Sequence, residues 1–240
     1  MNIKKWLLPV LILPFVCLSC NNLFGIKGKG NIVTEERNVT EFQNIILKSS
    51  ADMYVSRADS FLINVSDYEN LVQYLSVKSE SRALVVGVDP ATTILSNSKA
   101  RVNVAMPDSL KSVSITGSGN IMIDTTFKDL GKLYVSGSGS ILVNRNLDVN
   151  SLEVTILGSG NITAKGNVNS LKTVIAGSGS IYMDELVAAK ANCSISGSGS
   201  TLVHVTDSLA AYISGSGNVI YSGSPAVVAT TPGSGVVKRK

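Results

Sequence analysis

The amino-acid sequence predicts an all-β protein, a parallel β-solenoid (β-helix) with coils of about twenty residues. Gly-Ser-Gly occurs seven times at intervals of 18–21 residues, and hydrophobic and polar residues alternate on both sides of the copies. The composition is globular, with 44% hydrophobic, 16% charged and only 5% aromatic residues. A repeat this short cannot enclose its own core, so neighbouring copies must stack. The alternative fold is a stack of antiparallel β-sheets or a β-prism with Gly-Ser-Gly as the turns.

Residues 1–19 are typical of a lipoprotein signal peptide. A basic start (Met1–Lys5) precedes an apolar run of eleven residues (Trp6–Val16) that is too short to span a bilayer. The run Cys17-Leu18-Ser19-Cys20 resembles a bacterial lipobox, although Cys17 stands where leucine is usual. Cys20 would then be the lipidated first residue and would hold the protein at the outer membrane. The alternative is an ordinary signal peptide cleaved near Ser19.

Residues 20–110 are expected to form a tether followed by irregular β-structure. Residues 20–31 contain several glycines and are expected to be a flexible linker. Residues 32–110 predict larger, irregular coils that cap one end of the solenoid. Residues Asp67 to Leu75 have helical spacing and predict one short helix. We expect strands within Val39–Val55, Phe61–Val65, Leu84–Val88 and Ala100–Met106, a corner at Lys48–Asp52 and a turn near Pro90.

Residues 111–235 predict the regular solenoid. Two residues before each Gly-Ser-Gly lies a column of Ile115, Val135, Ile156, Ile175, Ile195 and Ile213. Four residues after the first glycine lies a second column of Ile121, Ile141, Ile162, Ile181, Thr201 and Val219. This alternation indicates strands whose β-branched side chains point inward. The corner glycines are Gly117, Gly119, Gly137, Gly139, Gly158, Gly160, Gly177, Gly179, Gly197, Gly199, Gly215 and Gly217.

Two properties of the corners follow from their residue types. We expect the glycines to allow a positive φ and a tight corner where a Cβ would clash. The residue after each Gly-Ser-Gly carries a short polar side chain, and stacking would bring these side chains into a hydrogen-bonded ladder, as stacked amides do in cross-β structures. This column is Asn120, Ser140, Asn161, Ser180, Ser200 and Asn218.

The ionisable residues do not form a pattern that indicates catalysis. His204 is the only histidine, in an outward column with Asp184 and Ser222. No nucleophile elbow or oxyanion arrangement accompanies these three residues, so we interpret Asp184 and His204 as a surface ion pair. A polysaccharide-cleaving enzyme would need its acidic and basic residues clustered on one face, and those of this chain are scattered. We therefore predict no enzymatic activity.

Neither a metal nor a cofactor is predicted. Histidine, cysteine and aspartate are too scattered for a metal site, and strands rather than helices follow Gly-Ser-Gly, which argues against a phosphate-binding loop. Cys193 is left without a disulfide partner after removal of the signal peptide and falls in an inward column. Nucleic acid is not an expected partner either. The formal net charge of +4 becomes +2 without Lys4 and Lys5, and residues 236–240 form only a short basic tail.

One outward column is unexpectedly apolar. Five residues after the first glycine of each corner lie Met122, Leu142, Thr163, Tyr182, Leu202 and Ile220. Tyr134, Val174 and Tyr212 precede the corners and are expected to extend this surface. A contiguous exposed apolar strip usually marks a contact surface. Our hypothesis is that it packs against another protomer, giving a homo-oligomer, or against the N-terminal half.

The repeats resemble those of a known family. The Gly-Ser-Gly-Asn-Ile and Gly-Ser-Gly-Ser-Ile copies, the Val39–Val55 segment, and Asp67–Leu75 followed by Ala83-Leu84-Val85-Val86 resemble the putative auto-transporter adhesin, head GIN domain family. The resemblance covers about Ile32 to Tyr221. It implies a β-helical domain of lipid-anchored or secreted proteins of Gram-negative bacteria, and it brings no catalytic motif.

Two function classes fit these observations. The first is a non-catalytic, membrane-anchored protein of the cell envelope that binds a protein or glycan ligand through its repetitive surface, as an adhesin does. The second is a periplasmic structural or sensing partner of another envelope protein. The sequence alone does not separate a surface-facing from a periplasmic domain.

Overall fold

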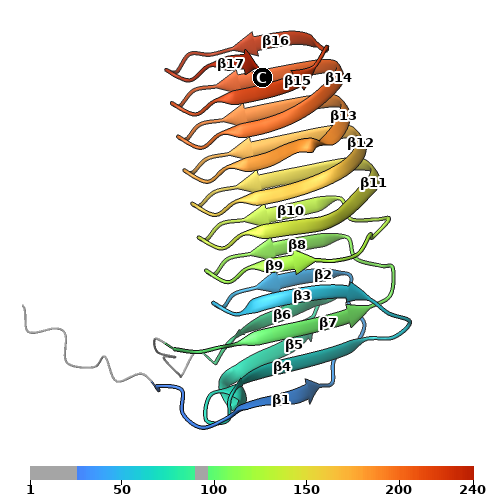
Figure 1. The fold of residues 1–240 in the computed structure, drawn as a ribbon, viewed down its shortest axis with the longest axis vertical. Helices are drawn as coiled ribbons and strands as arrows, with labels where there is room; N and C mark the ends of the chain where they lie inside the picture. Colours follow the sequence, from blue (N-terminus) through green and yellow to red (C-terminus); the bar gives the residue numbers. More distant parts are fainter. Residues whose placement is uncertain (1–25, 90–96) are drawn as a thin grey trace, which may run out of the picture.

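The fold is a single stack of β-coils along the long axis of the molecule (Figure 1). The computed structural model describes residues 26–89 and 97–240. The strands of the regular region pair in parallel, each coil lying on the equivalent strands of the coil before it. The parallel β-solenoid is therefore confirmed, and the antiparallel prism is not the fold.

Each coil contributes one strand before its Gly-Ser-Gly corner and one after it, and these form two separate ladders. We call them the pre-corner sheet and the post-corner sheet. The pre-corner sheet stacks β6 (Ala83–Val88), β2 (Asn44–Leu47), β8 (Ser112–Ile115), β10 (Lys132–Val135) and the last residues of β11. The post-corner sheet stacks β7 (Arg101–Met106), β3 (Asp52–Arg57), β9 (Ile121–Ile123) and the first residues of β11.

From β11 onward, one long strand leaves a corner on the post-corner sheet, bends, and arrives at the next corner on the pre-corner sheet. These strands are β11 (Ile141–Ile156), β12 (Ile162–Ile175), β13 (Ile181–Ile195) and β14 (Thr201–Ile213). The final coils contain β15 (Val219–Gly223), β16 (Ala226–Thr230) and β17 (Val237–Arg239). At the bends opposite the corners, the register between neighbouring strands shifts, which indicates β-bulges.

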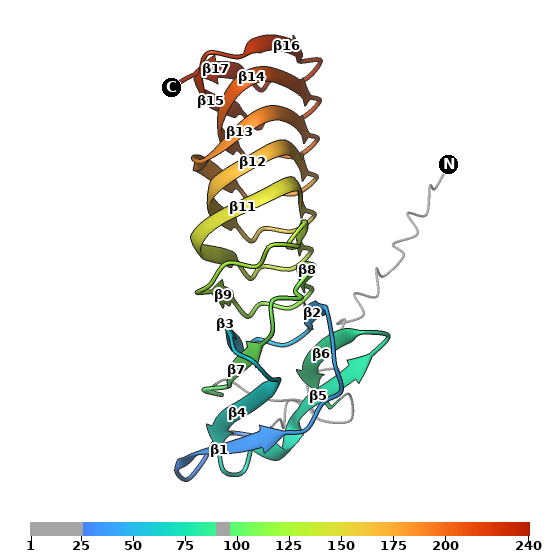
Figure 2. The same ribbon diagram turned by 90° about the vertical axis from the view of Figure 1, so that its right-hand side faces the viewer.

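The N-terminal half forms the base of the stack (Figure 2). β1 (Ile32–Arg37) and β7 both pair antiparallel with β4 (Leu62–Tyr68), and β5 (Leu75–Glu80) forms an antiparallel hairpin with β6. β2 and β3 lie between β6 and β7 on one side and β8 and β9 on the other. One hydrophobic core runs through both halves, so the irregular base and the regular coils are packed as one body.

The predicted helix at Asp67 to Leu75 is wrong in extent. Asp67 lies within strand β4. The only helical residues of this segment form a single 3-10 turn, η1 (Val72–Tyr74). Asp67 is fully buried, and its carboxylate accepts hydrogen bonds from the Ser98 hydroxyl (2.6 Å) and the Lys99 amide (2.8 Å). A buried carboxylate must be satisfied in this way, and the strand conformation aims it at residues 98 and 99. The predicted turn near Pro90 lies outside the described residues.

The inward columns form the core that the alternation predicts. The column that precedes the corners is completely buried from Ile115 through Ile213. The column that follows the corners is buried as well, and Thr201 takes the place of an isoleucine in it. Burying one such aliphatic side chain contributes roughly 1.5–3 kcal/mol. Because the columns repeat in every coil, this contribution accumulates along the stack.

The corner glycines are required by close contact between successive coils. A Cβ added to Gly137 would lie 1.9 Å from the carbonyl oxygen of Gly117, and one added to Gly177 would lie 1.9 Å from that of Gly158. Among the described glycines, a positive φ occurs at Gly30, Gly166 and Gly223, which are outside the Gly-Ser-Gly copies. The expectation of a positive φ at the corners is therefore wrong. Glycine is needed there because a Cβ would collide with the neighbouring coil, and not because the backbone is left-handed.

A hydrogen-bonded ladder runs along the residues that follow the corners, but its rungs differ from stacked amides. Each side-chain oxygen accepts the backbone N–H of the equivalent residue in the next coil, so serine and asparagine serve equally well. The rungs are Ser140 N–H to Asn120 Oδ1 (3.1 Å), Asn161 N–H to Ser140 Oγ (3.2 Å), Ser180 N–H to Asn161 Oδ1 (3.0 Å) and Ser200 N–H to Ser180 Oγ (3.3 Å). The ladder satisfies backbone donors at positions where the chain turns.

We expect Gly177→Ala to lower the free energy of unfolding by about 3 kcal/mol, because its Cβ would collide with backbone that cannot rotate away. Gly131→Ala is the matched control, since its Cβ would lie 3.5 Å from the nearest atom, the carbonyl oxygen of Ser151. That variant should change stability by less than about 1 kcal/mol. Urea unfolding of both variants measures the difference, and equal midpoints would contradict the role given to the corner glycines.

Candidate functional site

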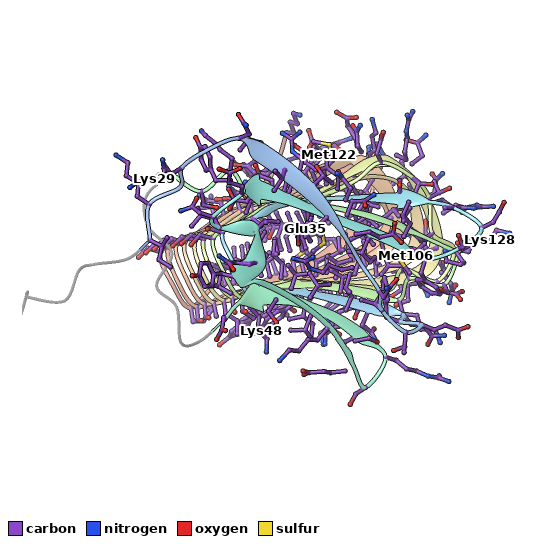
Figure 3. All side chains as sticks on the ribbon, turned by 90° about the horizontal axis from the view of Figure 1, so that it is seen from below. Lys29, Glu35, Lys48, Met106, Met122 and Lys128 are labelled. Atoms are coloured by element: carbon purple, nitrogen blue, oxygen red, sulfur yellow. The ribbon has the colours of Figure 1, made fainter. Side chains whose placement is uncertain are left out.

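The outward apolar column forms one continuous strip on the post-corner sheet. Its side chains are in register from coil to coil: Tyr54, Met122, Leu142, Thr163, Tyr182, Leu202 and Ile220. We call these seven residues the outward strip. Met122 points away from the core on one side of the stack (Figure 3). Tyr182 is the most exposed member at 40%, and its neighbours are partly shielded by one another.

Tyr54 belongs to the strip, although the spacing of the Gly-Ser-Gly copies does not predict it. Its corner, Lys48–Asp52, contains no Gly-Ser-Gly, so a count from the glycines does not reach it. A similarity between Asp52-Met53-Tyr54 and Asn120-Ile121-Met122 in the sequence could have placed Tyr54 in this column, because the two segments pair in register. The guanidinium of Arg101 lies over the Tyr54 ring, 5.1 Å from its centroid, so this ring already has a partner.

Tyr134 and Tyr212 do not join the outward strip. They lie in the pre-corner sheet, in a column that also contains Ser114, Thr155 and Ser194. A sharp corner separates the two sheets of each coil, so outward side chains before and after it face opposite sides. The expectation that these tyrosines extend the strip is therefore wrong, as it is for Val174 in the same column.

The N-terminal half does not pack over the strip. Its strands β3 and β7 lie in the post-corner ladder, below the regular coils, and β3 lengthens the strip through Tyr54. The hypothesis that the N-terminal half covers the strip is contradicted by this stacking. A contact with another protomer stays a prediction.

Three adjoining hollows follow the strip and the bend beside it. The first, of about 270 Å³, lies between Tyr54, Met122 and Leu142. The second, of about 180 Å³, is lined by Leu142, Asn144, Thr163, Lys165, Tyr182, Asp184 and Glu185. The third, of about 400 Å³, is lined by Asp124, Thr125, Thr126, Asn144, Arg145, Asn146 and Lys165. The first and second hollows share Leu142, and the second and third share Asn144 and Lys165, so the three adjoin one another; we refer to them together as the groove.

Most charges in this groove are neutralised by neighbours. Asp124 accepts hydrogen bonds from Arg145 Nε (3.1 Å) and Asn144 Nδ2 (3.1 Å). Asp184 pairs with Lys240 at 3.1 Å. Among the described residues, no ion pair or side-chain hydrogen bond joins Lys165 or Glu185 to a neighbour, and these two residues have opposite charges. Asp52, which lines the first hollow, accepts a hydrogen bond from Asn120 Nδ2 (2.9 Å), so the groove as a whole is slightly acidic. The groove therefore combines an apolar floor with amide, carboxylate and ammonium groups along one edge.

The expected ion pair between Asp184 and His204 does not form. The register shifts between Met183 and Val187, so His204 lies opposite Val187 in β13 and opposite Ser222 in β15. Asp184 binds Lys240 instead. A bulge at the bend is not visible in a count from the glycines, which is why the sequence placed Asp184 beside His204.

Cys193 lies in the core, completely buried. Burial raises the pKa of the Cys193 thiol to about 11, because the low-polarity core disfavours the charged thiolate. A thiol in this state is a poor nucleophile and a poor metal ligand. In the described part of the chain, His, Cys, Asp and Glu form no group of three that could hold a metal ion.

The predicted lipidation site, Cys20, lies outside the described residues. The residues that follow are held by two asparagine side chains of the base. Asn70 accepts the Lys29 amide (2.8 Å) and donates to the Lys27 carbonyl (3.0 Å), and Asn97 accepts the Gly28 amide (2.8 Å). The end of the expected tether is thus fixed to the base. Within the described ranges, no helix is long and apolar enough to cross a membrane.

Comparisons with known proteins agree on one family and one fold. The family model described as "putative auto-transporter adhesin, head GIN domain" matches residues 41–225. Among curated proteins, none matches the sequence. Three similar crystal structures are a putative adhesin from Bacteroides fragilis (22% identity, TM-score 0.83, 90% of this chain and 100% of that one), a putative lipid binding protein from Parabacteroides distasonis (25%, 0.76, 90% and 99%) and a putative adhesin from Parabacteroides merdae (25%, 0.70, 90% and 99%). The three structures share the fold of this chain over 90% of its length.

The buried thiol leads to a test of the core. In a chain with Cys17 and Cys20 replaced by alanine, Cys193 should react with a thiol reagent at pH 8 only after unfolding. Because the unfolded thiol ionises first, near its ordinary pKa of 9.0, the free energy of unfolding should fall between pH 9 and pH 11, by up to about 3 kcal/mol.

The control for this test also carries Cys193→Ala, which removes this contribution and leaves the other titrating groups in place. The difference between the two chains isolates the thiol. An identical decline of stability with pH in both would contradict the raised pKa.

Proposed function

Because the chain belongs to the putative auto-transporter adhesin, head GIN domain family, we propose that it is a non-catalytic, lipid-anchored adhesion protein of the cell envelope. Its lipid would be attached at Cys20, and its partner would bind along the outward strip and the adjoining groove. The strip is the observation that carries this proposal, because seven side chains from seven coils form one surface of a kind that usually has a partner.

The anchor and the base support a defined orientation. Six residues lie between Cys20 and Lys27, whose carbonyl is bound by Asn70, and the seven steps of an extended chain between them span at most about 25 Å. The base of the solenoid would therefore stay near the membrane, and the regular coils would extend away from it. A partner approaching from outside would meet the post-corner sheet along its length.

The second candidate function is that of a periplasmic partner of another envelope protein. It uses the same anchor and the same surface, and it differs only in the side of the outer membrane on which the domain lies. The short interval between Cys20 and the base favours this function when the partner is itself embedded in the membrane.

Protease accessibility on intact cells separates the two candidates. For an adhesin, external protease should remove the wild-type domain from whole cells, and Cys20→Ala should release the protein from the membrane fraction. Cys17→Ala is the matched control, because it changes the other cysteine of the same segment and should leave anchoring intact.

Protection of the domain until the outer membrane is opened would exclude adhesion and favour the periplasmic function. Membrane retention of Cys20→Ala equal to that of the wild type would contradict the lipid anchor.

A further inference from the structure

The groove beside the outward strip has the chemistry of a carbohydrate site. We infer that it binds an uncharged oligosaccharide, with Tyr182 as the stacking platform and the bend residues Asn144, Lys165 and Glu185 as hydrogen-bonding groups. This inference rests on the proposed function and gives it a ligand class.

The apolar side of the groove fits the faces of sugar rings. A pyranose presents C–H groups on its faces, and these pack well on aromatic and aliphatic side chains. Tyr182 is flanked in its column by Thr163 and Leu202. The small Thr163 leaves a depression between Leu142 and Tyr182, and the second hollow is located there. One ring lying in this depression would contact an aromatic platform on one side and an aliphatic wall on the other.

The polar side of the groove fits sugar hydroxyls. Asn144 offers an amide and Glu185 a carboxylate, while Lys165 supplies ammonium donors, and all three line the second hollow. Hydroxyl groups both donate and accept hydrogen bonds, so they use a mixed set of this kind fully. A few polar groups on an apolar floor are the usual composition of a small-molecule site.

The charge balance selects against other ligand classes. Arg145 is paired with Asp124, and Lys240 with Asp184, so a phosphate approaching either cation would also meet a carboxylate that repels it. The remaining Lys165 and Glu185 have opposite signs. An acyl chain would need a closed apolar cavity, whereas these hollows are open and partly polar. A neutral polyhydroxylated ligand both donates and accepts hydrogen bonds, so it fits this mixed and slightly acidic lining.

The groove is long enough to hold an extended ligand. Tyr54 and Tyr182 are four coils apart in one column, which corresponds to about 19 Å at the spacing of stacked strands. A chain of several sugars could lie along the strip over this length. The third hollow, around Arg145 and Asn146, opens from the second and would receive a branch or a neighbouring residue.

The test compares two tyrosines that differ in position and match in exposure. The full-length chain in detergent is applied to immobilised cellohexaose, maltohexaose, chitohexaose and mannohexaose. We expect binding to at least one of them, weakened about tenfold or more by Tyr182→Thr. Threonine already occupies this column at Thr163, so the variant should fold. Tyr212→Thr, at a tyrosine that is 47% exposed on the opposite sheet, should bind within about twofold of the wild type.

Asn144→Ala is a second variant that removes a hydrogen-bonding group and leaves the platform, and it should also weaken binding. The inference is overturned if none of the four hexasaccharides binds, or if Tyr182→Thr and Tyr212→Thr behave alike. It is also overturned if Tyr182 instead affects binding to phosphatidylglycerol vesicles or self-association in sedimentation. Those results leave the anchored adhesin in place, because protease accessibility and the Cys20 variant test it separately.

Discussion

The close approach of successive coils at the Gly-Ser-Gly corners is the constraint on which the rest of this structure depends. The carbonyl oxygen of each first corner glycine points along the stack at the glycine of the next coil, which leaves no room for a Cβ. The same carbonyl accepts a backbone hydrogen bond from the next corner, as Gly117 does from Ser138 at 3.2 Å. Contact and hydrogen bond together set the register of one coil on the next.

Once the corners are in register, every other column follows. The isoleucines before and after the corners superpose and fill the interior, and the serine and asparagine residues after the corners superpose and form the ladder. Outward residues superpose in the same way. When one outward position of the twenty-residue repeat is apolar in most copies, these side chains therefore stack into a strip that runs along the molecule.

The bends opposite the corners are under a weaker constraint, and they provide the irregular part of the surface. Register shifts occur there in three successive strand pairs, and they displace Asn144, Lys165 and Asp184 relative to a regular repeat. The groove forms where these irregular residues adjoin the regular strip. A regular scaffold beside an irregular edge is a common arrangement for binding sites, because the scaffold holds the irregular residues in place.

The sequence by itself determined the fold class, the corner glycines, the inward columns and the outward position of Met122 through Ile220. These features depend on contacts between equivalent residues of adjacent repeats, and such contacts are readable from periodicity. Only the tertiary structure decided which outward residues share a face. Tyr134 and Tyr212 are separated from the strip by the corner, Tyr54 joins it through a corner without glycine, and Asp184 binds Lys240 because a bulge removes it from His204. The reason is physical: a repeat specifies which residues stack, while corners and bulges set the direction in which a side chain points, and that direction depends on backbone geometry that the spacing of residues does not encode.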